Sequence, residues 1–267
     1  MGLRVNTNIA SLTAQRNLGS VSGRLQGNYS RLSSGLRIAS AADDAAGLGI
    51  SEKMRSQIRS FTVAGRNAQD GISLVQTAEG SLNEVSNLLG RMRELAVQAA
   101  SETLSTTDRA TLDTEYQAII SEIDRVAGEA NFNDVNLLNG ASTLNIQVGI
   151  DSGQTIAVST IDARTSALGP FTDVSSNASS ELATIDGAID AVNTARGGFG
   201  ASQNRLQSAY SSIQTARENL SAAESRIRDV DVAAETADLT RNSILQQAAT
   251  AVLAQANTQP QLALSLI

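Results

Sequence analysis

Histidine, cysteine and tryptophan are all absent from this chain of 267 residues. Without histidine there is no Ser-His-Asp triad, no His-containing zinc site and no H-E-x-x-H protease motif. Without cysteine there is no disulfide, no thiol nucleophile and no thiolate metal ligand, although this says little about the redox compartment. We therefore expect no enzymatic activity, no metal site and no cofactor.

Aromatic residues make up 3% of the chain, and Pro170 and Pro260 are its two prolines. Alanine, serine, leucine, glutamine and asparagine dominate instead. Such small or flexible side chains suit thin seams between helices better than they fill a wide core. The composition therefore predicts an elongated helical molecule rather than a compact domain.

The chain also lacks runs of like charge and unbroken apolar segments. Its net charge is −7, and its 20 basic residues are 19 arginines and Lys53, with no stripe suited to nucleic acid. Residues 242–267 carry no charged side chain, but glutamines and asparagines interrupt them, whereas a membrane helix needs roughly 18 nearly continuous apolar residues. We expect neither nucleic-acid binding nor membrane insertion.

The first residues, 1–15, are similarly low in charge, with Arg4 alone. Polar residues follow Arg4 where a signal peptide would have an apolar segment, so we expect any export to avoid cleaved-signal secretion.

Three interpretations fit the uncharged C-terminal stretch: an assembly helix, a membrane-surface helix or a disordered tail. Because membrane-surface helices usually carry Lys or Arg, the pattern favours burial of both ends against other copies of the chain.

Small and apolar residues recur at spacings of three and four, the pattern of a coiled coil. In the C-terminal half this pattern predicts one helix about 80 Å long. Its positions are Ile185, Ala188, Val192, Ala195, Phe199, Ser202, Leu206, Ala209, Ile213, Ala216, Leu220, Ala223, Ile227, Val230, Ala234 and Ala237.

The N-terminal half has three shorter stripes. Their positions are Leu18, Val21, Leu25, Tyr29, Leu32 and Leu36; then Ile72, Val75, Ala78, Leu82, Val85, Leu89, Met92, Ala96 and Ala99; then Leu112, Tyr116, Ile119, Ile123 and Val126. Ser105 and Asp108 form a capping-box pattern before the third stripe, which we expect to end at Gly128.

Between the helical halves, Asn, Asp and Gly punctuate short β-type runs. Thr143–Val148 and Thr155–Ser159 flank Asp151-Ser152-Gly153, which predicts a β-hairpin within 143–159. The Ser-rich residues 172–180 predict a loop. The expected fold class is mainly α: a long antiparallel helical rod or coiled coil with a small β-hairpin, in which the returning helix brings the two termini together.

Two local patterns invite a catalytic interpretation that the residues do not support. The neighbouring carboxylates Asp43 and Asp44 would point about 100° apart on a helix, so they fit a turn or a helix start better. The glycines of 197–200 follow no strand and precede no lysine, unlike a phosphate loop. On periodicity alone, Arg91, Arg93 and Glu94 make a solvated helix face with weak ion pairs.

Several specific strings closely resemble the N- and C-terminal cores of bacterial flagellins, over about residues 3–160 and 182–266. The N-terminal strings are Asn6-Thr7-Asn8, Arg31-Leu32-Ser33-Ser34-Gly35-Leu36-Arg37, Asp43-Asp44-Ala45-Ala46-Gly47-Leu48, Arg66-Asn67-Ala68-Gln69-Asp70-Gly71-Ile72-Ser73, Arg93-Glu94-Leu95-Ala96-Val97-Gln98 and Glu122-Ile123-Asp124-Arg125-Val126. The C-terminal strings are Gln203-Asn204-Arg205-Leu206, Ser225-Arg226-Ile227-Arg228-Asp229, Ile244-Leu245-Gln246-Gln247-Ala248 and Val252-Leu253-Ala254-Gln255-Ala256-Asn257.

The resemblance implies an extracellular subunit that polymerises into the flagellar filament, with both termini paired in a coiled coil along the channel. That innermost domain would be residues 1–42 with 228–267. A helical rod with the β-hairpin would be 43–227, and the variable outer domain of larger members would be missing. The implied partners are other flagellin subunits, an export chaperone of the flagellar secretion apparatus, and filament cap and hook-filament junction proteins.

Within this interpretation the C-terminal segment divides by chemistry. The candidate buried assembly contacts are Leu245, Val252, Leu253, Leu264 and Leu266. The candidate residues for a wet channel or a polar seam are Gln246, Gln247, Gln255 and Asn257, because uncharged polar groups avoid the cost of burying ions.

The resemblance also implies a host contact. Flagellins recognised by the Toll-like flagellin receptor present an Arg, a Leu and a Glu at positions that match Arg91, Leu95 and Glu115. Gly90 departs from that pattern, because recognised members typically carry Gln there, and glycine also loosens a helix by about 1 kcal/mol relative to alanine.

Two other functions remain open at this point. A hook-filament junction protein shares terminal patterns with flagellin but normally matches less completely. A coiled-coil signalling module, which belongs to a different class, predicts no β-hairpin and usually a membrane segment nearby. A secreted hydrolase lacks a credible nucleophile and base.

Overall fold

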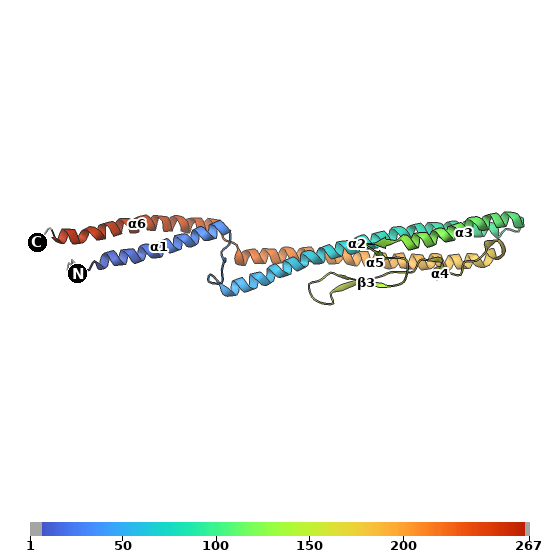
Figure 1. The fold of residues 1–267 in the computed structure, drawn as a ribbon, viewed down its shortest axis with the longest axis horizontal. Helices are drawn as coiled ribbons and strands as arrows, with labels where there is room; N and C mark the ends of the chain where they lie inside the picture. Colours follow the sequence, from blue (N-terminus) through green and yellow to red (C-terminus); the bar gives the residue numbers. More distant parts are fainter. Residues whose placement is uncertain (1–6, 265–267) are drawn as a thin grey trace. The chain divides into compact units, whose positions relative to one another are not determined.

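A computed structural model describes the backbone of residues 7–264 and the side chains of residues 7–258. The elements in chain order are α1 Ile9–Ser34, α2 Ala45–Ala99, α3 Thr106–Glu129, β1 Asn131–Phe132, β2 Val135–Asn136, β3 Thr143–Gln147, β4 Thr155–Ser159, α4 Thr165–Leu168, α5 Val174–Arg228 and α6 Val232–Leu264 (Figure 1). The predicted fold class, mainly α with a small β-hairpin, is confirmed.

The chain divides into two compact units. Unit 1 contains residues 1–56 and 219–267, and unit 2 contains residues 57–218. The division between the units therefore falls within α2 and α5. The expected innermost domain ended at position 42 and resumed at position 228. Unit 1 extends 14 residues beyond the first of these bounds and begins again nine residues before the second. Both helices run through the division without a break.

Unit 2 is built around one hydrophobic core. All nine positions of the second predicted stripe, Ile72 to Ala99, are buried on α2, each no more than 4% exposed. Residues of α3 and α5 complete the core, among them Tyr116, Ile185 and Phe199. Because burying one such large apolar side chain contributes roughly 1.5–3 kcal/mol, this core accounts for the stability of unit 2.

Two antiparallel strand pairs lie against this core. β3 pairs with β4 from Thr143↔Ser159 to Gln147↔Thr155, so the predicted hairpin is confirmed, and it buries Ile156 and Val158. β1 pairs with β2 across a turn in which Asn133 and Asp134 have positive φ, as the commonest two-residue hairpin turn requires. Sequence reasoning missed this second pair because each strand has only two residues.

Side-chain caps fix the starts of the helices. Ser105 and Asp108 form the predicted capping box of α3, which extends one residue beyond Gly128. Asp44 accepts a hydrogen bond from the Gly47 N–H, 2.9 Å away, at the start of α2. Asp43 accepts bonds from Ser40 in the preceding turn. The interpretation of this acidic pair as a turn or a helix start is therefore confirmed, with Asp43 in the turn and Asp44 at the start of α2.

The single C-terminal helix was a wrong prediction, because α5 ends at Arg228 and α6 begins at Val232. The Val230 N–H leaves the helix and donates to the carbonyl of Gly35. Asp231 then caps α6 by accepting from the Ala233 and Ala234 N–H groups. The apolar stripe does not continue past the break, since Ala234 is exposed.

The predicted loop at 172–180 was also wrong, because α5 already begins at Val174 and only kinks at Asn177. The Asp113 carboxylate of α3 accepts a hydrogen bond from the Val174 N–H at 3.0 Å, and Asp173 caps the Ser175 N–H. These local acceptors start a helix that Ser-rich composition argues against.

Candidate assembly surface of the terminal helices

The helices α1 and α6 of unit 1 lie antiparallel, side by side (Figure 1). Polar groups hold one end of this pair together. The Asn8 side chain donates to the Ala256 carbonyl at 2.7 Å and also caps α1 by accepting from the Ser11 N–H. The Ser11 hydroxyl donates to the Asn257 side chain at 2.7 Å. This end of the seam is polar, and its contacts join opposite ends of the sequence.

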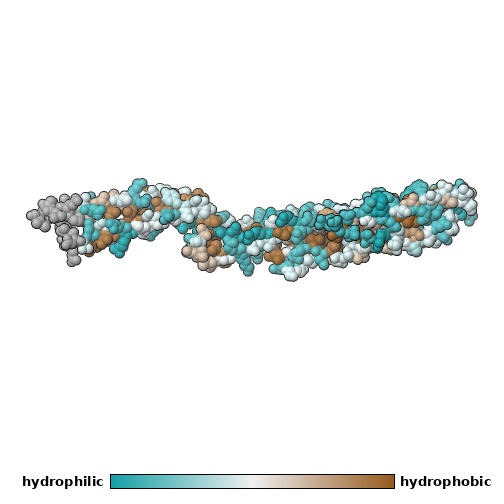
Figure 2. Space-filling view, viewed as in Figure 1, coloured by the Kyte–Doolittle hydropathy of each residue, from teal (hydrophilic) through white to brown (hydrophobic). Residues whose placement is uncertain are grey.

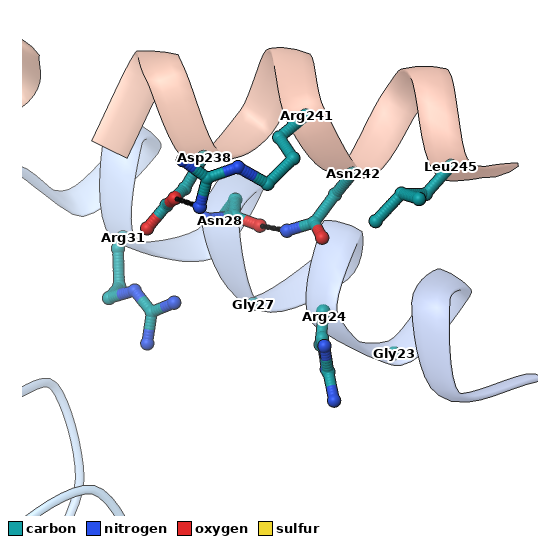
Figure 3. A pocket seen from close by; sticks show the side chains of 9 residues that line it. All are labelled: Gly23, Arg24, Gly27, Asn28, Arg31, Asp238, Arg241, Asn242 and Leu245. Carbon is teal, nitrogen blue, oxygen red and sulfur yellow. Dashed lines mark hydrogen bonds and ion pairs between the residues drawn. The ribbon is translucent and has the colours of Figure 1, made fainter. Parts of the chain in front are cut away.

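A second polar cluster lies further along the seam, at a groove of about 520 Å³ (Figure 3). The Asn242 amide donates to the Asn28 side-chain oxygen at 2.8 Å. Asn28 donates to Glu235, which also accepts from the Arg31 guanidinium at 2.9 Å. Asn28 is 2% exposed. Each buried amide is therefore satisfied by a partner from the other helix, as buried polar groups require.

Apolar burial in this pair is sparse. Among the described side chains of α1 and α6, Ala14 and Ala256 are the only apolar ones that are buried. Large apolar side chains lie outward instead: Ile9, Leu12 and Tyr29 on α1, and Val232, Ile244, Leu245 and Val252 on α6, each at least 43% exposed. Figure 2 shows such hydrophobic residues at the surface of this unit. The pair by itself leaves apolar surface that a neighbour could cover.

The sequence-predicted assembly residues fall on this surface as far as the structure describes them. Leu245 is 43% and Val252 59% exposed, and Leu253 is half-buried. Leu264 and Leu266 lie outside the residues whose side chains are described.

The predicted polar positions divide between the surface and the seam. Gln247 and Gln255 are exposed, and Gln246 is half-buried. Asn257 is exposed but pairs with Ser11 across the seam. Sequence reasoning missed Asn28 and Asn242, because their burial depends on each other; the stripe instead placed Tyr29 on the seam, where the structure leaves it 57% exposed.

An ion pair closes the other end of unit 1. Arg228, the last residue of α5, is 9% exposed and donates to the Glu52 carboxylate of α2 at 2.6 Å. Beside it, the Arg37 guanidinium donates to the Ile227 carbonyl. The hydrogen bond from Arg228 lowers the pKa of Glu52 below its ordinary value, and the Arg55 charge adds to this.

We predict that this ion pair makes the contact between α2 and the end of α5 acid-sensitive. Because folding lowers the pKa of Glu52, its contribution is complete above the ordinary value of 4.5 and is lost as the pH falls through the lowered value. In the assembled protein, the protection factors of the Val230 and Arg37 amides, which compare the exchange rate with the intrinsic rate at the same pH, should therefore fall on acidification. In the variant Glu52→Gln these two amides should exchange faster than in the wild type at pH 7, and their protection factors should change less with pH. Equal exchange in both proteins at pH 7 would rule out a role for the pair.

The three candidate receptor residues lie in unit 2. The Arg91 guanidinium pairs with the Glu115 carboxylate of α3 at 2.7 Å and with Glu94 at 2.8 Å, and both Arg91 and Glu115 are about half exposed. Leu95 is 1% exposed in the core, so its side chain does not reach the surface. Next to Arg91, a Cβ added at Gly90 would meet no atom within 4 Å. Of the three candidate residues, only the paired Arg91 and Glu115 therefore present their side chains at the surface.

None of the described helices combines the length and the hydropathy that a membrane-spanning segment needs. Across the described residues, no group of three or more Asp and Glu side chains is arranged to hold a metal ion. The feature that distinguishes this fold is the pair of terminal helices with exposed apolar faces. A protein with this fold belongs to the class of helical structural proteins.

Comparison with known proteins identifies the family. Residues 5–143 match the profile of the bacterial flagellin N-terminal helical region, and residues 182–267 match that of the flagellin C-terminal helical region. The chain is 47% identical to flagellin of Halalkalibacterium halodurans over 98% of this chain and 99% of that protein. It is 42% identical to flagellin of Bacillus subtilis (99% and 100%) and 41% identical to flagellin FlaB2 of Treponema pallidum (98% and 99%).

A solved structure agrees. The crystal structure of Bacillus cereus flagellin covers 60% of this chain and 94% of its own, with a TM-score of 0.51 and 35% sequence identity. The chain belongs to the bacterial flagellin family. It is a structural subunit of the extracellular flagellar filament, and the match over nearly its full length favours this function over the junction protein and the signalling module.

Proposed function

We propose that the terminal helices complete their fold only when subunits assemble. Residues 1–42 with 228–267 then form the innermost domain along the filament channel, and 43–227 form the surrounding rod. The two ends reach the channel unfolded, through the flagellar export apparatus, and pair on arrival. The chain acts by polymerisation and carries out no catalysis.

The sparse apolar burial between α1 and α6 carries this proposal. Ordering a residue costs roughly 1–2 kcal/mol of backbone entropy, and α1 and α6 contain 26 and 33 residues. Against that cost the described side chains of the pair supply two buried alanines, a few polar contacts and leucines and a valine that are only half-buried, among them Leu18, Val21, Leu25, Leu32 and Leu253. Neighbouring subunits supply the missing apolar contacts to Leu245, Val252, Leu253 and the residues that follow, while Gln247 and Gln255 face water.

Salt-induced polymerisation of the purified monomer tests the proposal. Hydrogen exchange followed by mass spectrometry should find α1 and α6 unprotected in the monomer and protected in filaments of uniform diameter seen by electron microscopy. The core of unit 2 should be protected in both. Protected terminal helices in a monomer that stays soluble would contradict coupled folding, and soluble dimers would favour a signalling module.

The partners follow from the same mechanism. An export chaperone binds the C-terminal segment before secretion, since exposed Ile244 and Val252 would otherwise associate early. The cap complex at the growing tip receives the unfolded ends, and the hook-filament junction proteins meet the first subunits.

The paired Arg91 and Glu115 also form a candidate contact for the host Toll-like flagellin receptor. Leu95 supports this surface from the core. Since Gly90 offers no side chain, we expect weak activation by the monomer in a reporter-cell assay. Gly90→Gln should strengthen the response by adding contact area on the helix face.

The variant Arg91→Ala should abolish the receptor response. Arg93→Ala is the matched control, because Arg93 makes a similar ion pair with Asp186 at 2.7 Å and has almost the same exposure. An equal loss in both variants would point to a general charge effect, and no response from any of the proteins would refute the receptor contact.

A further inference from the structure

Asn139 is the one asparagine of this chain that precedes a glycine. It lies between β2 and β3 in unit 2 and belongs to neither terminal helix. Its side chain is exposed. Within the described part of the chain, neither the Asn139 amide nor the N–H of Gly140 makes a hydrogen bond. Both groups are therefore available to react.

Gly140 makes this position chemically distinct. Its φ is +133°, in the region that glycine adopts without cost. Because it has no Cβ, nothing on the residue itself crowds its nitrogen as that atom approaches the preceding side chain. Every other asparagine is followed by a residue with a Cβ.

We propose that Asn139 is a site of spontaneous deamidation, with water as the co-reactant. The Gly140 nitrogen attacks the Asn139 Cγ, a new C–N bond forms, and the side-chain nitrogen leaves as ammonia after taking up a proton. The product is a cyclic imide. Water then adds to one of its two carbonyls and breaks one C–N bond, and no oxidant or reductant takes part.

The two ways of opening the ring give different products. Breaking the bond to Cγ leaves an ordinary aspartate, and both products add one negative charge to this exposed position. Breaking the bond to the main-chain carbonyl carbon leaves an isoaspartate, in which the backbone runs through Cβ and Cγ. Only the second product lengthens the main chain, by one carbon.

That extra carbon falls between two anchored carbonyls. The Leu138 carbonyl accepts from the Ala163 N–H at 2.9 Å, and the Gly140 carbonyl accepts from the Thr160 hydroxyl at 3.1 Å. Leu138 is fully buried and Thr160 is 6% exposed, so neither moves without repacking. Isoaspartate therefore loosens the segment that follows β4, whereas ordinary aspartate leaves it in place.

Ageing the purified full-length chain in mildly alkaline buffer tests the reaction. Peptide mapping by mass spectrometry should show Asn139 converting at least about tenfold faster than any other asparagine, which corresponds to about 1.4 kcal/mol in activation free energy. The variant Asn139→Gln should show no fast conversion anywhere. Conversion of Asn139 at the rate of the other asparagines would overturn the proposal.

The variant Asn139→Asp separates charge from backbone length. Hydrogen exchange at the Ala163 amide should rise in the aged wild type in proportion to its isoaspartate content, and should stay low in Asn139→Asp. An aged protein rich in isoaspartate but with unchanged exchange at Ala163 would refute the loosening.

Discussion

A chain that lacks residues 248–267 should not form filaments at any salt concentration that polymerises the full-length protein. The deletion removes exposed Val252 and half-buried Leu253, and with them the polar contacts that Ala256 and Asn257 make with α1. The remaining half of α6 keeps its contact with Asn28 but has no partner for Ser11. Since neither terminal helix buries enough apolar surface alone, we expect both to stay unfolded.

The rod should survive this deletion. The core of unit 2 draws on α2, α3 and α5, and none of its buried residues belongs to α6. Thermal unfolding of the truncated monomer should therefore match that of the full-length monomer, while electron microscopy and sedimentation show no polymer. Filaments of normal diameter from the truncated chain would refute assembly through the C-terminal helix. A large fall in melting temperature would mean that the segment stabilises the monomer instead.

Unit 2 has an apolar core, whereas the seam between α1 and α6 in unit 1 is largely polar. This contrast explains which buried positions the sequence could predict. The α2 stripe was correct at every position because its residues face one apolar core, where spacing alone decides burial. The α1 stripe failed at Tyr29, because the seam there is organised by Asn28 and its partners Glu235 and Asn242. Those partners are more than 200 residues away in sequence, so no local pattern could reveal them.

The break between α5 and α6 illustrates a different limit. Asp231 is a good N-cap, and this signal was available in the sequence. The three-four spacing masked it, because Ile227 and Val230 before Asp231 and Ala234 and Ala237 after it continue one apolar pattern in the sequence. What ends α5 is the hydrogen bond from Val230 to the carbonyl of Gly35, which belongs to the turn after α1. A tertiary contact therefore decided the boundary.

The receptor residues show a third limit. The periodicity placed Arg91 on a solvated helix face, but Leu95, one turn away, was not among the predicted stripe positions, so the spacing did not predict its burial. The core packing of α2 against α3 and α5 buries Leu95, and the Arg91 side chain reaches across to Glu115. The family resemblance identified the three residues. Only the packing in the structure shows that Arg91 and Glu115 are exposed and that Leu95 is buried beneath them.

Replacing Asn28 with alanine should raise the critical concentration for polymerisation strongly. Asn28 serves two partners on α6: it accepts from Asn242 and donates to Glu235. In the variant, buried Asn242 loses its acceptor, and leaving a buried polar group unsatisfied costs about 1–3 kcal/mol. Because each 1.4 kcal/mol is tenfold in an equilibrium constant, the critical concentration should rise roughly 5- to 150-fold.

The matched control is Asn17→Ala, since Asn17 lies on the same helix and is exposed. Its critical concentration should stay close to that of the wild type.

The double variant Asn28→Leu with Asn242→Leu replaces both polar partners by apolar side chains, so that neither amide is left without a partner. Apolar replacement should strengthen the pairing of α1 with α6, yet remove the polar contact that fixes their register, as a buried asparagine does in coiled coils. We expect this variant to associate as irregular aggregates. Regular filaments at a lower critical concentration would show that the asparagine pair is dispensable for register, and that its role is only to keep the seam weak enough to open during export.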